Sequence, residues 1–155
     1  MMKISDHLSP DAVRLLGDAD KDEALGTLSV AACAGTDLDV ARVREGIAAR
    51  EKMMTTGVGL GIALPHTRLP EVRQFSMALG ISKQGIAYRS LDGKPVHIIL
   101  LMVGPTGSNE QHLRLMAAAT LVLKGDECRR ALQASATAEE AWQAFDAAAR
   151  AIQGS

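Results

Sequence analysis

Four histidines occur in the 155-residue chain, and one of them, His66, stands at the end of a glycine-rich segment. That segment, TTGVGLGIALPHTR at residues 55–68, leads through three glycines, a short apolar run and a proline to the imidazole. Neutral imidazole is a nucleophile and a general base near pH 7. Glycine permits positive φ and proline fixes φ, so such a segment can hold one ring in a set position. His66 is therefore the principal candidate for chemistry.

The other histidines have different sequence surroundings. His7 lies in a polar N-terminal stretch, where we expect a solvated side chain. His97 falls in a run of apolar residues, which predicts either a buried histidine with its hydrogen bond satisfied or one at the margin of a strand. His112 opens a predicted helix after a Gly-Pro-rich loop, at the edge of an apolar stripe. Since His66 and His112 both stand where a loop meets a regular element, we expect them to act together.

The glycine spacing does not match the loops that bind nucleotides. A Walker A loop needs GxxxxGK[ST] between a strand and a helix, and no GK[ST] is present. A Rossmann fingerprint opens a helix after a strand, whereas GVGLGIALPH follows a predicted helix and precedes a predicted strand. A metal site on His66 and His112 lacks a third ligand at suitable spacing. We expect neither a cofactor nor a metal.

Composition restricts the class of protein. With 155 residues, 47% of them hydrophobic, the chain suits one domain over residues 1–155. The net charge of -1 gives no reason to expect nucleic acid or an anionic membrane as partner. Cys33 and Cys128 are isolated, so we expect small core residues and no disulfide or zinc site. Without an apolar leader or a membrane-length apolar run, we expect a cytoplasmic protein.

Two predicted helices lead into the glycine segment. A short strand at 13–16 precedes a helix at 21–34, which Asp20 can cap. A second helix at 39–54 follows a turn, with Arg50 on its polar face. Its expected inward stripe consists of Val40, Val43, Ile47 and Met54.

Beyond His66 the apolar period changes to that of strands. After a possible strand at 62–64, residues 75–82 alternate bulky and small side chains, which predicts a helix packed closely on the small face. Residues 86–91 form a short strand or turn, and 96–103 are typical of a central strand covered on both sides. Helices are predicted at 109–124, at 126–134 and after a Thr137–Glu140 capping box. The expected inward residues of the first are Leu113, Met116, Ala117, Thr120 and Leu123.

The segment AREKMMTTGVGLGIALPHTRLPE resembles the active-site signature of a bacterial family, the type-2 EIIA domains of the phosphotransferase system (PTS). This is the branch of fructose, mannitol and nitrogen-regulatory IIA proteins. The matching positions are Arg50, Glu51, Thr56, Gly57, Gly59, Gly61, Pro65 and His66. The resemblance continues through LDGKPVHIILLMVGP, SNEQHLRLMAAAT and DECRRALQASATAEEAW, and so covers nearly the whole chain. It implies an α/β fold, a mixed β-sheet sandwiched by helices on both faces, in agreement with the predicted alternation.

The resemblance also implies a mechanism. His66 would accept a phosphoryl group from the phosphohistidine of an HPr-type carrier protein, without metal or nucleotide. His112 would lie beside His66 and hydrogen-bond the phosphoryl oxygens, and Arg50 would neutralise part of their charge. The family's phosphorylated atom is usually Nε2, which the sequence does not determine. Support for the phosphoryl group is expected from Thr56, Gly57, Gly59, Gly61 and Thr67.

Thr67 departs from the family pattern, which commonly has glycine after the histidine. Its hydroxyl either hydrogen-bonds the ring or a phosphoryl oxygen, or it faces solvent. Because His66, His112 and Arg50 are all present, we do not expect the threonine to inactivate the site.

Within the family, the signature and the free-standing length look closer to nitrogen-regulatory IIA proteins than to sugar-transporting IIA domains. We therefore predict a regulatory phosphocarrier, whose partners are an HPr-type carrier and a regulatory target protein or IIB domain. Two alternatives stay open. One is a fructose- or mannitol-specific IIA subunit that passes phosphate to a IIB domain, and the other is a IIA-like binding module that never carries phosphate.

Overall fold

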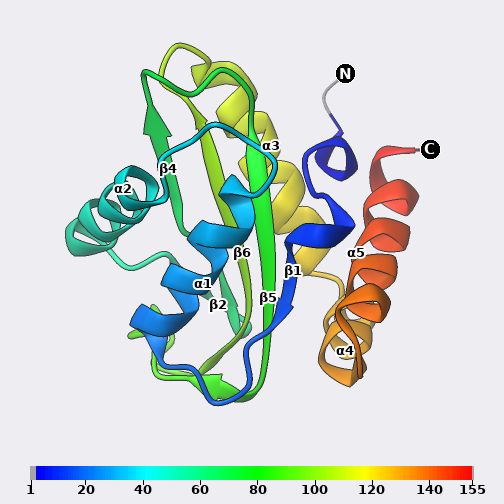
Figure 1. Ribbon diagram of the computed structural model, residues 1–155. Coiled ribbons are helices and arrows are strands. Elements are labelled where there is room, and N and C mark those ends of the chain that lie inside the picture. The colour runs from blue at the N-terminus through cyan, green and yellow to red at the C-terminus, as the bar shows by residue number, and fades with distance from the viewer. Residues whose placement is uncertain (1–2, 155) are drawn as a thin grey trace.

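A six-stranded mixed sheet forms the centre of the computed structural model, which describes residues 3–154 (Figure 1). The strand order is β1–β5–β6–β3–β2, and β4 also pairs with β6. The strands are β1 (Val13–Leu15), β2 (Gly57–Gly59), β3 (Ile62–Ala63), β4 (His66–Leu69), β5 (Ser76–Ile86) and β6 (Val96–Pro105). The pairs β2–β3 and β5–β6 are antiparallel, and the other pairs among the described strands are parallel.

Helices cover both faces of the sheet, as predicted. Figure 1 shows α1 and α2 on one side and α3, α4 and α5 on the other. The helices are α1 (Lys21–Cys33), α2 (Val40–Met53), α3 (Asn109–Leu123), α4 (Asp126–Ala134) and α5 (Ala138–Gln153), with short 3-10 turns at Ile4–Asp6 and Pro10–Ala12. Within residues 3–154, no helix is long and apolar enough to cross a membrane.

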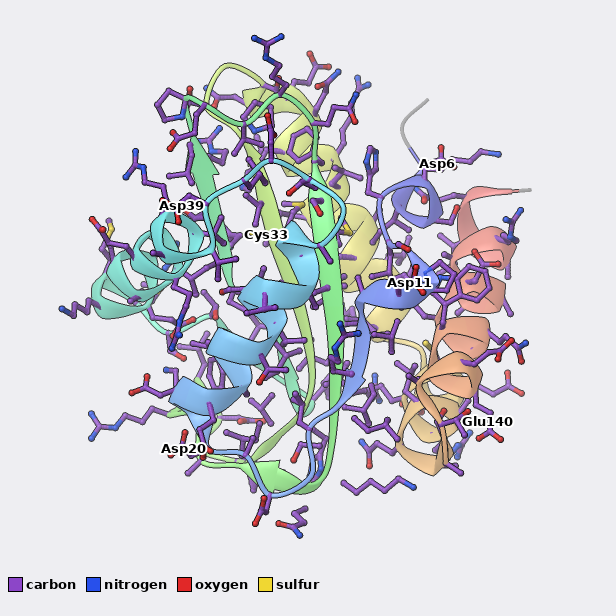
Figure 2. All side chains as sticks on the ribbon, in the orientation of Figure 1. Asp6, Asp11, Asp20, Cys33, Asp39 and Glu140 are labelled. Atoms are coloured by element: carbon purple, nitrogen blue, oxygen red, sulfur yellow. The ribbon has the colours of Figure 1, made fainter. Side chains whose placement is uncertain are left out.

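Local capping begins both helices that lead to the glycine segment. Asp20 accepts a hydrogen bond from the Glu23 N–H (2.9 Å), and Glu23 reaches back to the Asp20 N–H, which completes a capping box. Asp39 accepts from the Ala41 N–H (3.0 Å) at the start of α2. Figure 2 shows both aspartates at these helix ends. The cap predicted at Asp20 is confirmed.

The pairing of β5 with β6 places the core. Leu79 lies opposite Leu100, and almost every residue of β6 is buried, which confirms its prediction as a central strand. On the small face of β5, a Cβ added at Gly80 would lie 3.0 Å from Leu28 of α1, and Ser76 Oγ donates to the Ala32 carbonyl (2.6 Å). The predicted close helix packing on this face is therefore confirmed.

Two predicted stripes differ from the structure. Met54 is 61% exposed, because the backbone turns extended there (φ -167°, ψ 141°) and leaves α2 before the stripe returns inward. In α3, Leu113 is 66% exposed and Ala117 is also exposed. The buried residues are His112, Leu115, Ala119, Val122 and Leu123, so the inward position predicted for Leu123 is confirmed. From Leu115 onward the helix is apolar on most sides, so its sequence is compatible with several inward faces. The buried position of His112 identifies the face that packs on the sheet.

His7, His97 and both cysteines pack against other parts of the fold. His97 Nδ1 bonds to the Ser82 carbonyl (2.8 Å), as expected of a satisfied histidine. His7 is half-buried with its ring 6.0 Å from Phe75, so its side chain is less solvated than predicted. Cys33 and Cys128 are buried free thiols, which confirms their prediction as core residues.

β3 and β4 pair with β6 in the same register, although Leu64 and Pro65 separate the two strands. Ile62 lies opposite Ile98 and His66 opposite Met102, the same offset, so both strands follow one line along β6. Pro65 stands in the gap, where it has no N–H for the ladder, while its carbonyl accepts from the Met102 N–H (3.0 Å). β4, which begins at His66, was not predicted because this proline ends the apolar run.

Thr67 in β4 packs against Gly46 in the middle of α2. A Cβ added at Gly46 would lie 3.0 Å from Thr67 Cβ, closer than ordinary contact, and closer still to the hydroxyl. The larger residue after the histidine is thus accommodated by a glycine on the helix that covers it.

We expect Gly46→Ala to lower the free energy of unfolding by about 1–2 kcal/mol, because overpacking a stiff β-branched neighbour outweighs the helix propensity of alanine. In a Thr67→Gly background the same change should stabilise by about 0.5–1 kcal/mol, the ordinary advantage of alanine in a helix. Urea unfolding of the four proteins in this cycle measures both effects. An equal effect of Gly46→Ala in the two backgrounds would contradict the packing described.

Candidate functional site

Two imidazoles lie side by side where β4 and α3 begin. His66 is the first residue of β4, and His112 lies in the first turn of α3. Their ring centroids are 5.1 Å apart, with a tilt of 53° between the planes. β6 brings them together, because β4 runs along it and α3 follows it in the chain. The pair singled out in the sequence is one cluster in the structure.

A single hydrogen bond orients the His66 ring. Nδ1 lies 2.9 Å from the Leu64 carbonyl oxygen, which can only accept, so Nδ1 carries the proton and donates. Nε2 then has the free lone pair in the neutral ring. Burial lowers the pKa of His66 below its usual range, further assisted by the positive charges of Arg50 and Arg68. At neutral pH the ring is therefore an uncharged nucleophile.

His112 is buried and neutral. Only 8% of it is exposed, and its Nδ1 has no hydrogen-bond partner among residues 3–154. Burial lowers the pKa of His112 to about 4, and the nearby His66 and Arg68 act in the same direction. A neutral imidazole keeps one N–H to donate and one nitrogen to accept, so this ring has hydrogen-bonding capacity that the protein itself does not use.

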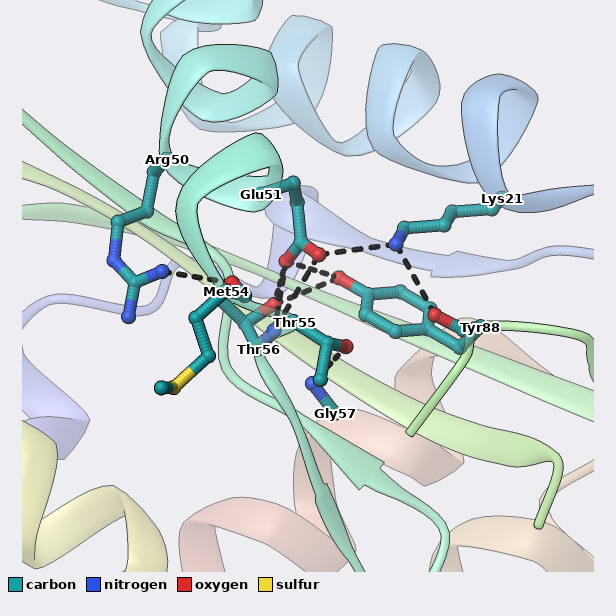
Figure 3. Close-up of polar contacts among 8 residues, drawn as sticks. All are labelled: Lys21, Arg50, Glu51, Met54, Thr55, Thr56, Gly57 and Tyr88. Atoms are coloured by element: carbon teal, nitrogen blue, oxygen red, sulfur yellow. Dashed lines mark hydrogen bonds and ion pairs between the residues drawn. The ribbon is translucent and has the colours of Figure 1, made fainter. Parts of the chain in front are cut away.

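The two rings border an open hollow of about 370 Å³. Its lining consists of Ala49, Arg50, Met53, His66, Thr67, Arg68, Thr106 and His112. Arg50 donates one hydrogen bond to the Met54 carbonyl (2.8 Å) at the end of α2, and Figure 3 shows it directed away from its neighbour Glu51. No group of three or more His, Cys, Asp or Glu side chains in residues 3–154 could hold a metal ion.

Arg68 also lines this hollow and was not predicted from the sequence. Side chains of β4 alternate, with His66 and Arg68 half-buried and Thr67 and Leu69 buried. The guanidinium donates to the side-chain oxygen of Asn109, in the first turn of α3. The two-residue spacing from His66 would have identified Arg68, had β4 been predicted.

A carboxylate network fixes the end of α2 beside the hollow (Figure 3). Glu51 accepts hydrogen bonds from the Thr56 N–H (3.1 Å) and the Thr56 hydroxyl. It also accepts from Tyr88 Oη (3.1 Å) and from Lys21 Nζ (3.0 Å). These bonds join α2 to α1, to the start of β2 and to the segment at Tyr88. Because Arg50 is adjacent to Glu51 in the chain, the same network positions Arg50.

The glycine segment supports the nucleophile from a distance. Gly59 (φ 100°) and Gly61 (φ 75°) use the left-handed region in the β2–β3 hairpin, as their residue type predicts. Gly57 packs on Ser90, and Thr56 joins the Glu51 network while its carbonyl accepts from the Leu64 N–H (3.0 Å). None of Thr56, Gly57, Gly59 and Gly61 is among the residues that line the hollow. Of these residues, Thr56 helps to hold Leu64, the hydrogen-bond partner of His66.

Thr67 borders the hollow while its side chain packs on Gly46. It is 8% exposed, so the reading that it faces solvent is wrong. The structure contains no hydrogen bond between its hydroxyl and the His66 ring. The difference from the usual glycine is therefore absorbed by packing against α2.

Sequence comparison with known proteins identifies a family and several relatives of this chain. Residues 6–148 match the family described as "Phosphoenolpyruvate-dependent sugar phosphotransferase system, EIIA 2". A nitrogen regulatory protein of Bradyrhizobium diazoefficiens is 32% identical over 139 residues, which are 89% of this chain and 91% of that protein. A fructose-specific EIIABC component of Bacillus subtilis is 32% identical over 133 residues, 84% of this chain, yet the match spans only 21% of that protein.

Solved structures have the same fold. The nitrogen regulatory protein IIA-Ntr of Neisseria meningitidis superposes with a TM-score of 0.83 at 26% identity, over 92% of this chain and 98% of that one. The mannitol IIA of Escherichia coli gives a TM-score of 0.74 at 16% identity, over 88% and 97%. With its paired histidines, its sheet and these matches, the chain belongs to the EIIA type 2 family of the phosphoenolpyruvate-dependent sugar phosphotransferase system.

Proposed function

We propose that this protein is a phosphohistidine carrier of the cytoplasm, which accepts a phosphoryl group on His66 Nε2 from an HPr-type carrier protein. The observation that carries the proposal is the hydrogen bond from His66 Nδ1 to the Leu64 carbonyl, since it leaves Nε2 as the nucleophilic nitrogen. A neutral ring beside two arginines in an open hollow is suited to accept an anionic group from another protein.

The transfer exchanges one nitrogen–phosphorus bond for another. The Nε2 lone pair attacks phosphorus in line, the bond to the donor's imidazole breaks, and its electron pair returns to the donor ring. Little covalent chemistry remains for the protein beyond positioning and charge stabilisation. Arg50 and Arg68 supply positive charge, and neutral His112 supplies an N–H for a phosphoryl oxygen.

Among the branches of the family, we favour a regulatory IIA protein of the nitrogen type. Supporting it are the near-complete match to the nitrogen regulatory protein and the higher TM-score of the IIA-Ntr structure. A sugar-specific IIA is the second candidate, because the fructose-specific relative has the same 32% identity. One of the solved neighbours is a mannitol IIA in complex with its phosphorylated IIB. Rapid transfer from the phosphorylated protein to a fructose-type IIB domain would support that second role.

Incubation with phosphoenolpyruvate, Enzyme I and HPr should place one acid-labile phosphate on the wild-type protein and none on His66→Gln. We expect Arg68→Gln and His112→Gln to slow phosphorylation by about 10–100-fold each, because each removes a positioned donor from the charged transition state. Time courses with ³²P-labelled phosphoenolpyruvate measure these rates.

Arg130→Gln is the matched control for Arg68→Gln. Arg130 is an exposed arginine of α4 whose side chain forms no hydrogen bond or ion pair in the described part of the chain, so its loss should leave the rate unchanged. An unlabelled wild-type protein would instead support the reading of a IIA-like binding module, and phosphate on His66→Gln would move the acceptor elsewhere.

The low pKa of His112 also makes stability depend on pH. Its pKa is about 4 in the folded protein and near 6.5 when unfolded, so between these values only the unfolded chain holds the proton. The free energy of unfolding should therefore fall as pH drops from 6.5 toward 4, and this contribution should be fully present above 6.5.

From about pH 7 to about pH 4.5 we expect the wild type to lose about 2 kcal/mol more than His112→Gln, allowing for water in the open hollow beside the ring. Urea unfolding of both proteins at a series of pH values gives the difference. Parallel pH profiles would mean that His112 is not held neutral by the fold.

A further inference from the structure

A second hollow lies between α1 and α2. It is separate from the hollow that His66 and His112 border, which we call the phosphohistidine hollow. It measures about 390 Å³, and its walls come from α1, α2 and the segment at 87–89. Four cationic side chains border it, namely Lys21, Arg44, Lys52 and Arg89, against the carboxylates of Asp22 and Glu51. We call it the α1–α2 cleft. None of its lining residues also lines the phosphohistidine hollow.

Three of the four cationic side chains of the cleft have no ion-pair partner within residues 3–154. Lys21 forms an ion pair with Glu51 (3.0 Å) and lies over the Tyr88 ring at 4.1 Å. The side chains of Arg44, Lys52 and Arg89 form no hydrogen bond or ion pair with any residue of 3–154. Like charges around one concavity repel one another and produce a positive potential there. An anionic ligand would convert that repulsion into binding energy.

Unusual backbone features accompany the two arginines of the cleft. Gly26, in the middle of α1, faces Arg44, and a Cβ added there would lie 3.0 Å from Arg44 Cζ. A glycine inside a helix is destabilising unless its space is used, and here it lets the guanidinium lie on α1. Arg89 adopts a left-handed conformation (φ 61°), which is rare for a residue with a bulky side chain. Such backbone strain concentrates at binding sites.

Apolar residues form another part of the cleft wall. Leu25 and Ile47 are buried, and Ala48 and Ala87 complete this part of the lining. A volume near 390 Å³ lies within the range of small-molecule sites. The cleft thus combines an apolar surface for the body of a ligand with several cations for its charged groups.

We propose that the α1–α2 cleft binds a small organic molecule that carries a diphosphate or two phosphate groups. Arg44, Lys52 and Arg89 contact the anionic groups, and the uncharged part of the ligand rests on the exposed Ala48 and Ala87, beside the buried Leu25 and Ile47. Phosphate fits this set best, because the arginine fork donates two parallel hydrogen bonds to it.

The cleft shares one wall with the phosphohistidine hollow. In the last turns of α2, Ala48, Glu51 and Lys52 face the cleft, while Ala49, Arg50 and Met53 face the hollow. A ligand in the cleft therefore lies against the helix segment that carries Arg50. The position is that of a regulatory site beside a phosphoryl-transfer site.

Three probes separate the contributions to binding: adenosine 5′-diphosphate, inorganic pyrophosphate and adenosine, each without divalent metal. We expect the diphosphate nucleotide to bind more tightly than either part alone, and to shift the amide NMR signals of the cleft residues in a saturable way. The double variant Arg44→Gln/Arg89→Gln should weaken its affinity at least about five-fold, because two of the charges that attract it are gone. Arg130→Gln should not change the affinity.

Folding of the double variant is checked by its thermal unfolding and by its phosphorylation at His66, both of which should match the wild type. Three outcomes would overturn the proposal. They are no saturable shifts at the cleft with any probe at millimolar concentration, equal affinities for nucleotide, pyrophosphate and adenosine, or equal weakening by Arg130→Gln and by the double variant.

Discussion

The hydrogen bond from His66 Nδ1 to the Leu64 carbonyl is the interaction on which the site depends. It selects the tautomer, and with the tautomer the nitrogen that can act as a nucleophile. The carbonyl can do this only if the backbone of Leu64 is held, and the Leu64 N–H is in turn bonded to Thr56 (3.0 Å). Thr56 belongs to the carboxylate network of Glu51. The glycine-rich hairpin, α2 and the central strand thus all contribute to the orientation of one ring.

Neutrality of the rings and positive charge around them are complementary features of the hollow. Burial of His66 and His112 disfavours their charged forms, and the arginines on either side disfavour them further. The positive charge is therefore confined to Arg50 and Arg68, whose guanidinium groups stay charged at any physiological pH. This division leaves the imidazoles free for nucleophilic attack and hydrogen bonding, and reserves the arginines for the phosphoryl oxygens.

Much of this arrangement could be predicted from the sequence, because strong local patterns encode it. The strand at 96–103, the small face of the strand at 75–82 and the cap at Asp20 all follow from periodicity and residue type, and each is confirmed. The pairing of His66 with His112 followed from their positions at loop ends together with the family resemblance.

The features that were missed or wrongly predicted from the sequence depend on tertiary contacts. β4 was missed because Pro65 interrupts the strand pattern, and Arg68 was missed with it. The inward face of α3 was misassigned in part because residues 115–123 are nearly all apolar and show no clear stripe, and because the buried side includes a histidine. Thr67 could not be placed because its partner, Gly46, lies on another element. The packing of Arg44 on Gly26 was equally invisible in the sequence.

The most direct test of the central claim is long-range ¹H–¹⁵N NMR of the phosphorylated, uniformly ¹⁵N-labelled protein, which identifies the ring nitrogen that bears phosphorus. We expect phosphorus on Nε2 of His66, with the proton kept on Nδ1 and its bond to Leu64 intact. Phosphorus on Nδ1 of His66, or on the ring of His112, would contradict the role assigned to that hydrogen bond.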